Sequence, residues 1–542
     1  MSPTTATPRR GSRPGRVAFV GAGPGDPGLV TLRARDQLAA ADVVVIDQVN
    51  RDDMVLRHAR PDVEIIDAGH GEHGEELTRA SRAKILVRAA KAVGEQGLVV
   101  RLMDGDPAMF NGLAEEALAL RKADIRFEVV PGVSAVTAVP TYAGVPLTSK
   151  SATAVHVVSA SDTHHDWAPD VPDHVTVVLL GVPESLGSAL AALLAAGRAP
   201  QTLVALTERG TTTSQVTHVS PLADVASLLR STTVRFPSLA VVGSTVSLRD
   251  EMSWFETKPL FGWTVLVPRT KDQAGATVER LESYGARADV VPTISVEPPR
   301  TPQQMERAVK GLVTGRYEWV GFTSANAVRA VREKFDEFGL DARAFSGLKI
   351  AAVGGVTADA LRAWGIVPDL VPSGEQSAAG LLAEWPEFDS LLDPINRVFL
   401  PRADIATDTL VAGLVGMGWE VDDVTAYRTV RAAPPAVEVR DAIKTGRFDA
   451  VVFTSSSTVR NLVGIAGKPH PSTVVAAIGP ATAKTAEEHG LRVDVLAPEA
   501  SSDALVDALA AHGLGLAVAA REAGEPVRRP SEKKPTSRRR AK

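Results

Sequence analysis

Short apolar runs rich in β-branched residues alternate with Ala-, Leu- and Arg-rich segments along nearly the whole chain. Such runs are typical of buried strands, and the intervening segments carry their apolar residues at helical spacing. The pattern predicts α/β domains with buried parallel strands. The expected strands include Val17–Val20, Val43–Ile46, Leu98–Leu102, Val175–Leu180, Leu203–Leu206 and Thr264–Val267, and an amphipathic helix is expected over Leu77–Val93.

A break in this pattern divides the chain at FETKPLFG, residues 255–262, where Pro and Gly precede a new strand. Beyond the break the chain repeats itself loosely. YEWVGFTSANAVRAV from Tyr317 resembles FDAVVFTSSSTVRNL from Phe448, and KIAAVGGVTADALRAWG from Lys349 resembles VVAAIGPATAKTAEEHG from Val474. This repetition predicts two similar lobes with a ligand cleft between them. Because the strand VLVPR precedes both copies, one lobe is expected to use both ends of this half.

Composition excludes several classes of site and location. The 542 residues include no cysteine, which rules out disulfides, thiolate metal sites and cysteine nucleophiles. The longest apolar stretches fall short of the ~20 residues of a membrane span. The start, MSPTTATPRRGSRPGR, lacks the apolar segment of a secretory signal. We therefore expect a cytoplasmic protein that does not bind a membrane.

The charge is distributed unevenly between the body and the ends of the chain. A net charge of −5 gives the body no basic field suited to nucleic acid, so no nucleic-acid partner is expected. Residues 1–15 form a predicted disordered extension. Residues 515–542 are predicted to form a disordered basic tail, because their charged, Pro-containing end carries almost no aliphatic residues.

The strongest local motif is VAFVGAGPGDPGLVTL, a strand that runs into a Gly- and Pro-rich turn. Glycines there let backbone N–H groups approach a ligand closely. A dinucleotide fingerprint is the main rival interpretation, and Asp47 lies roughly 20 residues on, where a ribose-binding acid would stand. The turn departs from that fingerprint because Asp26 replaces its last glycine, and Pro24 and Pro27 stiffen the loop. Nicotinamide binding is therefore disfavoured.

Five collinear stretches make a specific resemblance. They are GAGPGDPGLVTLRA with ADVVVIDQV; VVRLMDGDPAMF; VVPGVSAVTAVPTYAGVPLTSK; TVVLLGV with TLVALTERGTTTSQ; and PSLAVVGSTVSLRDEMSW. Residues 16–254 thereby resemble the tetrapyrrole methylases, in particular the uroporphyrinogen-III C-methyltransferases. The resemblance implies a two-domain methylase fold, S-adenosylmethionine as methyl donor, and methylation of uroporphyrinogen III at ring carbons 2 and 7 to precorrin-2. It also allows a homodimer through this half.

The resemblance assigns roles to particular residues. Asp47 corresponds to the family's proposed proton acceptor, since methylation of a pyrrolic carbon ends with loss of a proton. Taken alone, Asp47 could equally cap a helix, and Asp104 and Asp106 could be turn residues. The donor pocket corresponds here to Pro24, Asp104, Gly105, Asp106, Met109, Ser134, Ala135, Leu180 and Gly210.

Two departures from the family pattern bear on catalysis. The family's GKR segment, whose Lys is a candidate proton donor, reads DAGHGEHG here, and His70 or His73 could replace that Lys. The usual KGGDP reads LMDGDP. A synthase carrying a catalytically weak or regulatory methylase domain is therefore the alternative. The pairs His70 with His73 and His164 with His165 lack a collinear third ligand, so no metal site is expected.

The second half, residues 263–514, resembles the uroporphyrinogen-III synthases. The matching stretches are TVLVPRTKDQAGATVERLESYGARADVVPTISVEP, the two FTS copies, LPRADIATDTLVAGLVGMGWEVDDVTAYRTV and VAAIGPATAKTAEEHG. The resemblance implies a two-lobed α/β synthase fold, with lobe A over 263–296 plus 427–514 and lobe B over 297–426. It also implies cofactor-free closure of hydroxymethylbilane to uroporphyrinogen III with loss of water.

Departure of the hydroxyl needs a proton donor, and Tyr427 matches the family's candidate tyrosine. A buried core tyrosine is the other interpretation of this residue. Strand-to-helix turns are expected to bind the substrate's carboxylates through hydroxyls and helix N-termini, although each such residue alone could be a helix cap. The residues concerned are Ser324, Ser455, Ser456 and Thr482. A non-catalytic two-lobed binding scaffold remains a third hypothesis, which the α/β pattern alone would permit.

Overall fold

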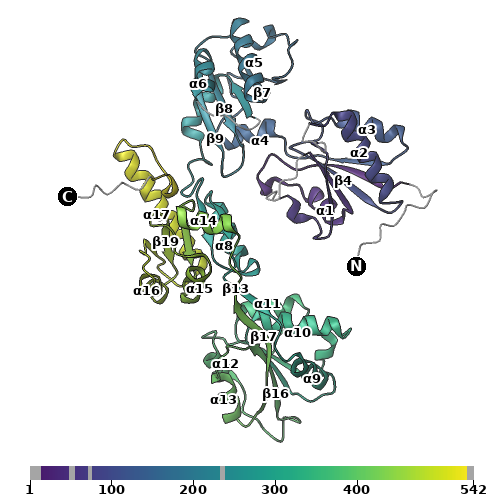
Figure 1. Cartoon of the computed structure of the whole chain (residues 1–542), viewed down its shortest axis with the longest axis vertical. Coiled ribbons are helices and arrows are strands. Elements are labelled where there is room, and N and C mark those ends of the chain that lie inside the picture. The colour runs from purple at the N-terminus through teal and green to yellow at the C-terminus, as the bar shows by residue number, and fades with distance from the viewer. Residues whose placement is uncertain (1–13, 48–54, 71–75, 232–237, 534–542) are drawn as a thin grey trace. The chain divides into compact units, whose positions relative to one another are not determined.

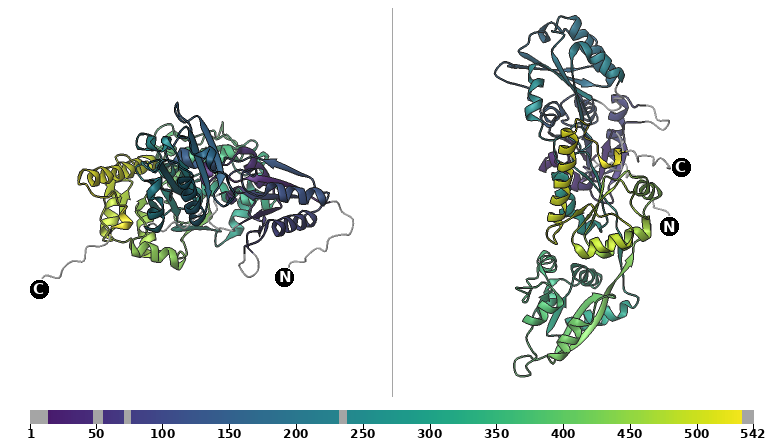
Figure 2. Two further views of the ribbon diagram at one scale, coloured as in Figure 1. Left: turned by 90° about the horizontal axis from the view of Figure 1, so that it is seen from above. Right: turned by 90° about the vertical axis from the view of Figure 1, so that its left-hand side faces the viewer.

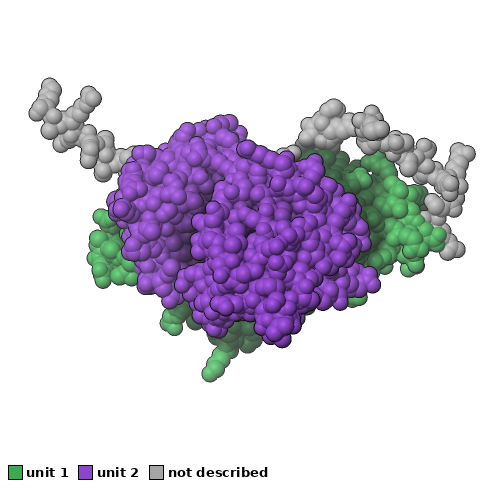
Figure 3. All heavy atoms as spheres, turned by 90° about the horizontal axis from the view of Figure 1, so that it is seen from below, with its two compact units in different colours: residues 1–263, 281–287, 513–527 green, residues 264–280, 288–512, 528–542 purple. Residues whose placement is uncertain are grey.

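A computed structural model describes residues 14–47, 55–70, 76–231 and 238–533. The chain divides into two compact units, coloured separately in Figure 3. Unit 1 comprises residues 1–263, 281–287 and 513–527, and unit 2 comprises residues 264–280, 288–512 and 528–542. The described residues form four five-stranded sheets. Helices pack against these sheets, as the ribbons of Figure 1 and Figure 2 show, which confirms the predicted α/β class.

The first sheet of unit 1 is entirely parallel, in the order β3-β2-β4-β1-β5. Its strands are β1 Arg16–Gly21, β2 Val43–Ile46, β3 Glu64–Asp67, β4 Leu98–Met103 and β5 Phe127–Val130, with helices α1 Leu32–Ala40, α2 Arg79–Ala92, α3 Leu113–Lys122 and α4 Ala135–Tyr142. The three strands predicted in this region are confirmed. The predicted helix begins at Arg79 because Thr78 caps it, its Oγ1 accepting from the Ser81 N–H at 3.2 Å.

The second sheet of unit 1 is mixed, in the order β6-β7-β10-β8-β9. Only β6 and β7 run parallel; β10 is antiparallel to both β7 and β8, and β8 is antiparallel to β9. The prediction of parallel strands was therefore wrong here. The apolar runs arise because both faces of the sheet are buried, with Leu179 and Leu206 in one core and Val178 and Ala205 in another. The elements are β6 Ala154–Ser159, β7 Val175–Gly181, β8 Leu203–Glu208, β9 Val216–Pro221, β10 Ser238–Val242, α5 Pro183–Ala195, α6 Val225–Ser231 and α7 Arg249–Met252.

Apart from Arg287 at the start of β12, unit 2 contains the two remaining sheets, β12-β11-β18-β19-β20 and β13-β17-β16-β14-β15. The first includes β11 Thr264–Val267, β12 Arg287–Val290, β18 Ala450–Phe453, β19 Val474–Ala477 and β20 Val495–Leu496. The second is formed by β13 Ile294–Glu297, β14 Trp319–Phe322, β15 Lys349–Ala352, β16 Arg397–Ala403 and β17 Glu420–Arg431. One lobe thus uses both ends of this half, as predicted.

The lobe boundaries differ from those expected at 297 and 427. Strand β17 is 12 residues long, and its last residues pair with all of β13, so both strands belong to the second sheet. Tyr427 therefore lies in lobe B. The helices of this half are α8 Lys271–Ser283, α9 Pro302–Val313, α10 Ala325–Glu337, α11 Gly355–Ala363, α12 Ala378–Glu384, α13 Thr409–Gly416, α14 Val437–Thr445, α15 Ser456–Ala466, α16 Pro480–Glu488 and α17 Ser502–Glu522.

The C-terminal region is ordered further than expected. Helix α17 runs to Glu522, past residue 514 where the synthase half was expected to end, because the Ala- and Leu-rich sequence favours a helix. Pro530 is buried, and the Ser531 N–H donates to Asp449 Oδ1 at 2.9 Å. The prediction of disorder is wrong for residues 515–533, whereas residues 1–13 and 534–542 lie outside the described part. By length and composition alone, α17 could span a membrane, although it buries Leu505 and Leu509 within the protein.

Candidate functional site

The carboxyl ends of the parallel strands β1, β4 and β5 bring three backbone loops into contact. Gly23 and Gly105 form a bridge in which the Gly105 N–H donates to the Gly23 carbonyl at 2.9 Å. A Cβ on Gly21 would lie 2.6 Å from the Gly105 carbonyl oxygen, and one on Gly132 only 2.1 Å from it. Larger residues cannot occupy these two positions without moving the loops apart. The loops that carry Pro24, Asp104, Gly105 and Ser134 thus converge.

Several predicted donor-pocket residues hold these loops in shape. Asp106 accepts from the Gly132 N–H through Oδ2 at 3.0 Å and from the Ala108 N–H through Oδ1 at 2.8 Å. Ser134 caps α4, its Oγ accepting from the Val136 N–H at 3.2 Å. The turn and cap interpretations therefore describe what these two side chains do. Hydrogen-bonding groups for a ligand at these loops come largely from the backbone.

A fourth loop comes from the second sheet of unit 1. The Asp26 N–H donates to Thr211 Oγ1 at 3.0 Å, and a Cβ on Gly25 would lie 3.1 Å from the Gly210 carbonyl oxygen. Thr211 has a φ of 66°, which is rare for a β-branched residue. Loops from both sheets therefore meet beside Pro24.

Three further predicted donor-pocket residues lie near these loops. Leu180 and Ala135 pack on the same apolar cluster beneath the loops. Met109 continues the turn after Asp106, with its N–H donating to the Asp106 carbonyl at 3.1 Å, and it is partly exposed. Leu180 and Ala135 thus share one apolar core.

Asp47, at the carboxyl end of β2, is held by two arginines. Arg101 Nη2 lies 2.6 Å from Asp47 Oδ1, and Arg82 Nη1 lies 3.5 Å from the same atom. Arg101 is fully buried on β4 and also binds the buried Glu116, with Nε–Oε2 at 2.8 Å. Burial opposes the charge of Arg101, but its bonds to Glu116 and Asp47 outweigh burial and raise its pKa. The Asp47 carboxylate is therefore fixed in position by an ion-pair network.

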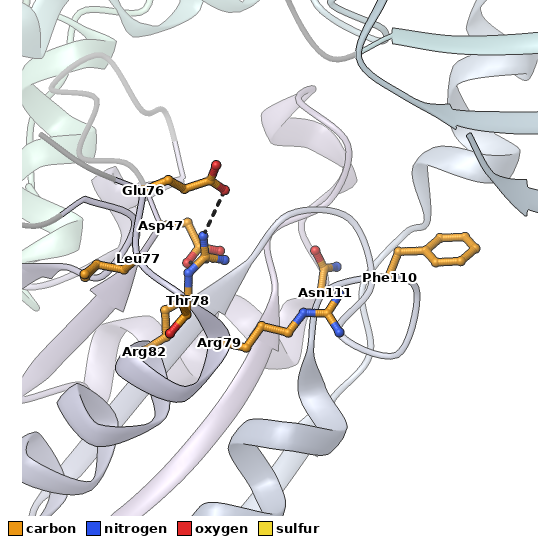
Figure 4. A pocket seen from close by; sticks show the side chains of 8 residues that line it. All are labelled: Asp47, Glu76, Leu77, Thr78, Arg79, Arg82, Phe110 and Asn111. Carbon is orange, nitrogen blue, oxygen red and sulfur yellow. Dashed lines mark ion pairs between the residues drawn. The ribbon is translucent and has the colours of Figure 1, made fainter. Parts of the chain in front are cut away.

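A cavity of about 500 Å³ opens beside Asp47. Figure 4 shows Arg82 between Asp47 and Glu76, and Arg79 beside Asn111. The side chain of Asn111 also donates to the carbonyls of Asp104 and Asp106, 2.7 Å each, so one residue joins the cavity to the donor loops. The lining residues are Asp47, Glu76, Leu77, Thr78, Arg79, Arg82, Phe110 and Asn111.

Sequence reasoning missed three arginines here: Arg79 and Arg82, which line the cavity, and Arg101, which binds Asp47. Arg101 carried a signal, because it interrupts the apolar run LVVRLM of a buried strand, where a charge needs a partner. Nothing in the sequence marked Arg79 and Arg82, because arginines are common on the polar face of any amphipathic helix.

The histidines that the structure describes do not gather into a metal site. Among the described residues no group of three or more His, Cys, Asp or Glu side chains is placed to hold a metal ion. His165 instead shares the buried Asp170 with His156, each ring nitrogen 2.7 Å from a carboxylate oxygen. The His70 Nδ1 lies 4.0 Å from the Asp67 Oδ1, and His73 lies outside the described residues.

In unit 2, the structure pairs Tyr427 with Ser324. The two hydroxyl oxygens are 2.9 Å apart, and Tyr427 is buried in β17, opposite Ala403 at the end of β16. Ser324 also caps α10, with its Oγ accepting from the Ala327 N–H at 3.1 Å. A tyrosine hydroxyl that already has a polar neighbour beside a helix N-terminus is suited to proton transfer as well as to packing.

The other predicted substrate residues lie together in lobe A. Ser455 caps α15 in a capping box with Thr458. Ser456 Oγ donates to the Ala481 carbonyl at 3.0 Å and accepts from Thr485 Oγ1 at 2.9 Å, which ties the starts of α15 and α16 together. Thr482 is buried in α16. Two helix N-termini therefore lie side by side, an arrangement that favours anions.

The two halves match different family models. Residues 16–226 match the tetrapyrrole (corrin/porphyrin) methylases, and residues 275–507 match uroporphyrinogen-III synthase HemD. A porphyrin biosynthesis protein HemD from Ruminiclostridium josui is 31% identical over 512 residues, which cover 92% of this chain and 99% of that protein.

Relatives that are covered almost entirely by the alignment match the first half. An S-adenosyl-L-methionine-dependent uroporphyrinogen III methyltransferase from Methanosarcina barkeri is 37% identical over 243 residues, 44% of this chain and 94% of that protein. The crystal structure of the native uroporphyrin III C-methyl transferase from Thermus thermophilus is 33% identical and covers 43% of this chain and 100% of its own, with a TM-score of 0.37.

Proposed function

This chain belongs to the tetrapyrrole methylases through its first half and to the uroporphyrinogen-III synthases through its second, two enzyme families of porphyrin biosynthesis, and on that premise we propose that it performs two consecutive reactions. The second half closes hydroxymethylbilane to uroporphyrinogen III without a cofactor. The first half then methylates that product at ring carbons 2 and 7 to give precorrin-2. The observation that carries the methylase part of the proposal is Asn111, which borders the Asp47 cavity and bonds to the loop of Asp104 and Asp106. The synthase part is supported by the pairing of Tyr427 with Ser324.

The converging glycine loops fit S-adenosylmethionine, which supplies an electrophilic methyl group when bound. The surroundings of Gly21 and Gly132 leave no room for side chains, and Gly105 has a φ of 61° that favours glycine, so backbone N–H and carbonyl groups form the surface there. Such a surface can bind the adenosine and amino-acid parts by hydrogen bonds. Leu180 and Ala135 supply an apolar wall that helps to exclude water from the methyl group.

Asp47 accepts the proton that the methylated ring carbon must lose. Its Oδ1 is bound by Arg101 and Arg82, which fixes the direction of the carboxylate relative to the cavity. A positioned carboxylate at a strand's carboxyl end is the arrangement that general-base catalysis requires. Arg79 and Arg82 are placed to bind acidic side chains of the tetrapyrrole, because guanidinium groups pair well with carboxylates.

In the synthase half, Tyr427 donates a proton to the departing hydroxyl of the linear substrate. Ser324, 2.9 Å away, holds the tyrosine hydroxyl in place. The adjacent N-termini of α15 and α16, with Ser455 and Ser456, bind substrate carboxylates through backbone N–H groups and hydroxyls.

Supplying hydroxymethylbilane to the purified full chain, with and without S-adenosylmethionine, tests both reactions. Without the donor we expect the type III isomer of uroporphyrinogen, and with it precorrin-2, each identified by chromatography and mass spectrometry. Formation of only the type I isomer, which arises spontaneously, would contradict the synthase half of the proposal. Unmethylated type III product at saturating donor would instead favour the second candidate, a synthase with a weak or regulatory methylase domain. The absence of the GKR lysine is the observation that favours this second candidate.

A further inference from the structure

Glu256 lies in FETKPLFG, the segment that the sequence presents as a simple connection, yet its carboxylate is fully engaged. Its Oε1 accepts from Gln215 Nε2 at 2.8 Å and from Thr217 Oγ1 at 2.6 Å, and its Oε2 accepts from Arg249 Nη2 at 2.5 Å. The side chain is only 15% exposed. A flexible connecting segment does not require three such bonds, so this residue serves the domain that precedes it.

The bonds of Glu256 continue into the loop that carries Gly210. Glu256 holds the amide NH2 group of Gln215, so the Gln215 Oε1 faces the Thr211 N–H and accepts from it at 2.7 Å. Gln215 and Thr211 are both buried, at 2% and 1% exposure. A buried N–H that loses its acceptor is costly, so the orientation of the Gln215 amide matters to this loop.

Thr211 in turn reaches the donor loop of the first sheet. Its Oγ1 accepts from the Asp26 N–H at 3.0 Å, next to Pro24 and Gly25. Its positive φ of 66° is strained for a β-branched residue and persists only if the surroundings hold it. The hydrogen bonds that run from Glu256 through Gln215 to the Thr211 N–H help to hold Thr211 in this conformation.

Trp254 and Phe255 are linked to Asp26 indirectly, through Tyr142 of α4. The Tyr142 hydroxyl donates to Asp26 Oδ2 at 2.7 Å, and the Tyr142 ring packs edge-on against Trp254 and Phe255, with centroids 5.0 and 4.6 Å away. Burial and the neighbouring Asp26 carboxylate raise the pKa of Tyr142, so its hydroxyl remains a donor at neutral pH. The backbone N–H of Asp26 is thus linked to Glu256 through Thr211 and Gln215, and its carboxylate is linked to Trp254 and Phe255 through Tyr142.

We propose that Glu256 is a positioning residue of the methyl-donor site, and that residues 254–256 belong functionally to the methyltransferase rather than to a passive connection. The inference rests on the proposed function, since it takes the loops of Pro24 and Gly210 as the donor site. Glu256 touches no reacting atom. It acts through Gln215 and Thr211, so its loss should weaken binding of the donor more than it slows transfer from bound donor.

Calorimetric titration of the full chain with S-adenosylhomocysteine tests the inference. In Glu256→Gln, the charge is lost and one carboxylate oxygen becomes an NH2 group, so the bonds to Gln215, Thr217 and Arg249 cannot all be kept. We expect the Kd to rise about tenfold or more, as for loss of a charge-assisted hydrogen bond. The KM for S-adenosylmethionine should rise similarly, while kcat at saturating donor stays within about threefold. Glu256→Asp keeps the charge but shortens the reach, so it should recover part of the affinity. Glu251→Gln, an exposed site on α7 with the same charge change, is the matched control.

The outcomes separate the inference from the assignment on which it rests. Wild-type affinity in both Glu256 variants would overturn the role of Glu256 and leave the methyltransferase assignment intact. No binding by the wild type would overturn that assignment and this inference together. The urea midpoint of unit 1's transition, measured on the same preparations, reports folding of the half that contains Glu256. If Glu256→Gln fails that check, the Glu256→Asp titration decides alone.

Discussion

Asp47 is the proposed base, and two arginines fix its position. A substitution can remove the base while keeping the shape of the side chain. Asp47→Asn keeps the shape of the side chain but removes the base, so methylation of supplied uroporphyrinogen III should slow by about 10²–10⁴-fold. Affinity for S-adenosylhomocysteine should stay near that of the wild type, because Asp47 lies outside the donor loops. Asp62→Asn, at an exposed carboxylate, is the control. Methylation at the wild-type rate in Asp47→Asn would show that another group takes the proton.

Arg101 also stabilises the fold, because it neutralises a buried carboxylate in the ion-pair network of Asp47. It is the buried partner of Glu116, whose side chain is 1% exposed. Arg101→Met would leave this carboxylate buried without its cation, and breaking a buried pair in this way costs about 3–5 kcal/mol. We expect the urea midpoint of unit 1's transition to fall accordingly. An unchanged midpoint would mean that Glu116 finds water or another donor. Arg88→Met, at an exposed position on α2, controls for the loss of a surface charge.

At the scale of elements, the start of α2 determines which side chains line the cavity. Thr78 caps the helix, so Arg79 and Arg82 stand three residues apart on one face of the first turn. Arg79→Gln should raise the KM for uroporphyrinogen III by about three- to tenfold, a modest effect because Arg79 is half exposed and screened by solvent. The effect should shrink at high salt. Arg88→Gln on the same helix should change neither the KM for uroporphyrinogen III nor its dependence on salt. An equal rise in KM in the Arg79 and Arg88 variants would exclude a specific role for Arg79.

The elements also show what the sequence can and cannot determine. Val43–Ile46 and Thr264–Val267 were predicted to the residue, because a short run of apolar residues between turns has few alternatives to a buried strand. The direction of β10 was not predictable, since burial on both faces produces the same apolar run whichever way the strand points. The length of β17 was hidden for a similar reason. Its last residues, TVR, alternate too weakly to show on which sheet they lie.

The candidate site divides in the same way. The glycine loops were predictable, because close backbone contact leaves a direct mark on the sequence, as at Gly21 and Gly132. The ion pairs of Asp47 were not, since Arg82 and Arg101 come from elements distant in sequence and only the parallel order β2-β4-β1 brings β4 beside β2. Glu256 left no mark at all. A single acid in a Pro- and Gly-containing segment has the composition of a loop, whatever it binds.

At the scale of the whole molecule, the two proposed active sites share no residue. Asp47 and the donor loops belong to unit 1, whereas Tyr427, Ser324, Ser455 and Ser456 belong to unit 2. Fusion of two consecutive enzymes does not require their chemistry to be coupled. Single substitutions in the intact chain should therefore remove one activity at a time.

Tyr427→Phe in the full chain tests this independence from the synthase side. The substitution removes one hydroxyl and keeps the ring, so ring closure should slow by roughly ten- to a hundredfold, a smaller loss than for Asp47 because the bilane's own pyrrole nitrogen also assists departure of its hydroxyl. Methylation of supplied uroporphyrinogen III should keep its wild-type rate. Ser324→Ala should produce a weaker effect of the same kind, since it removes only the 2.9 Å partner of the tyrosine. Parallel assays of Asp47→Asn should give the reverse pattern, with closure intact. If either Asp47→Asn or Tyr427→Phe abolished both activities in a folded chain, the two halves would have to act as one coupled catalyst, and the division of function at residues 255–262 would be wrong.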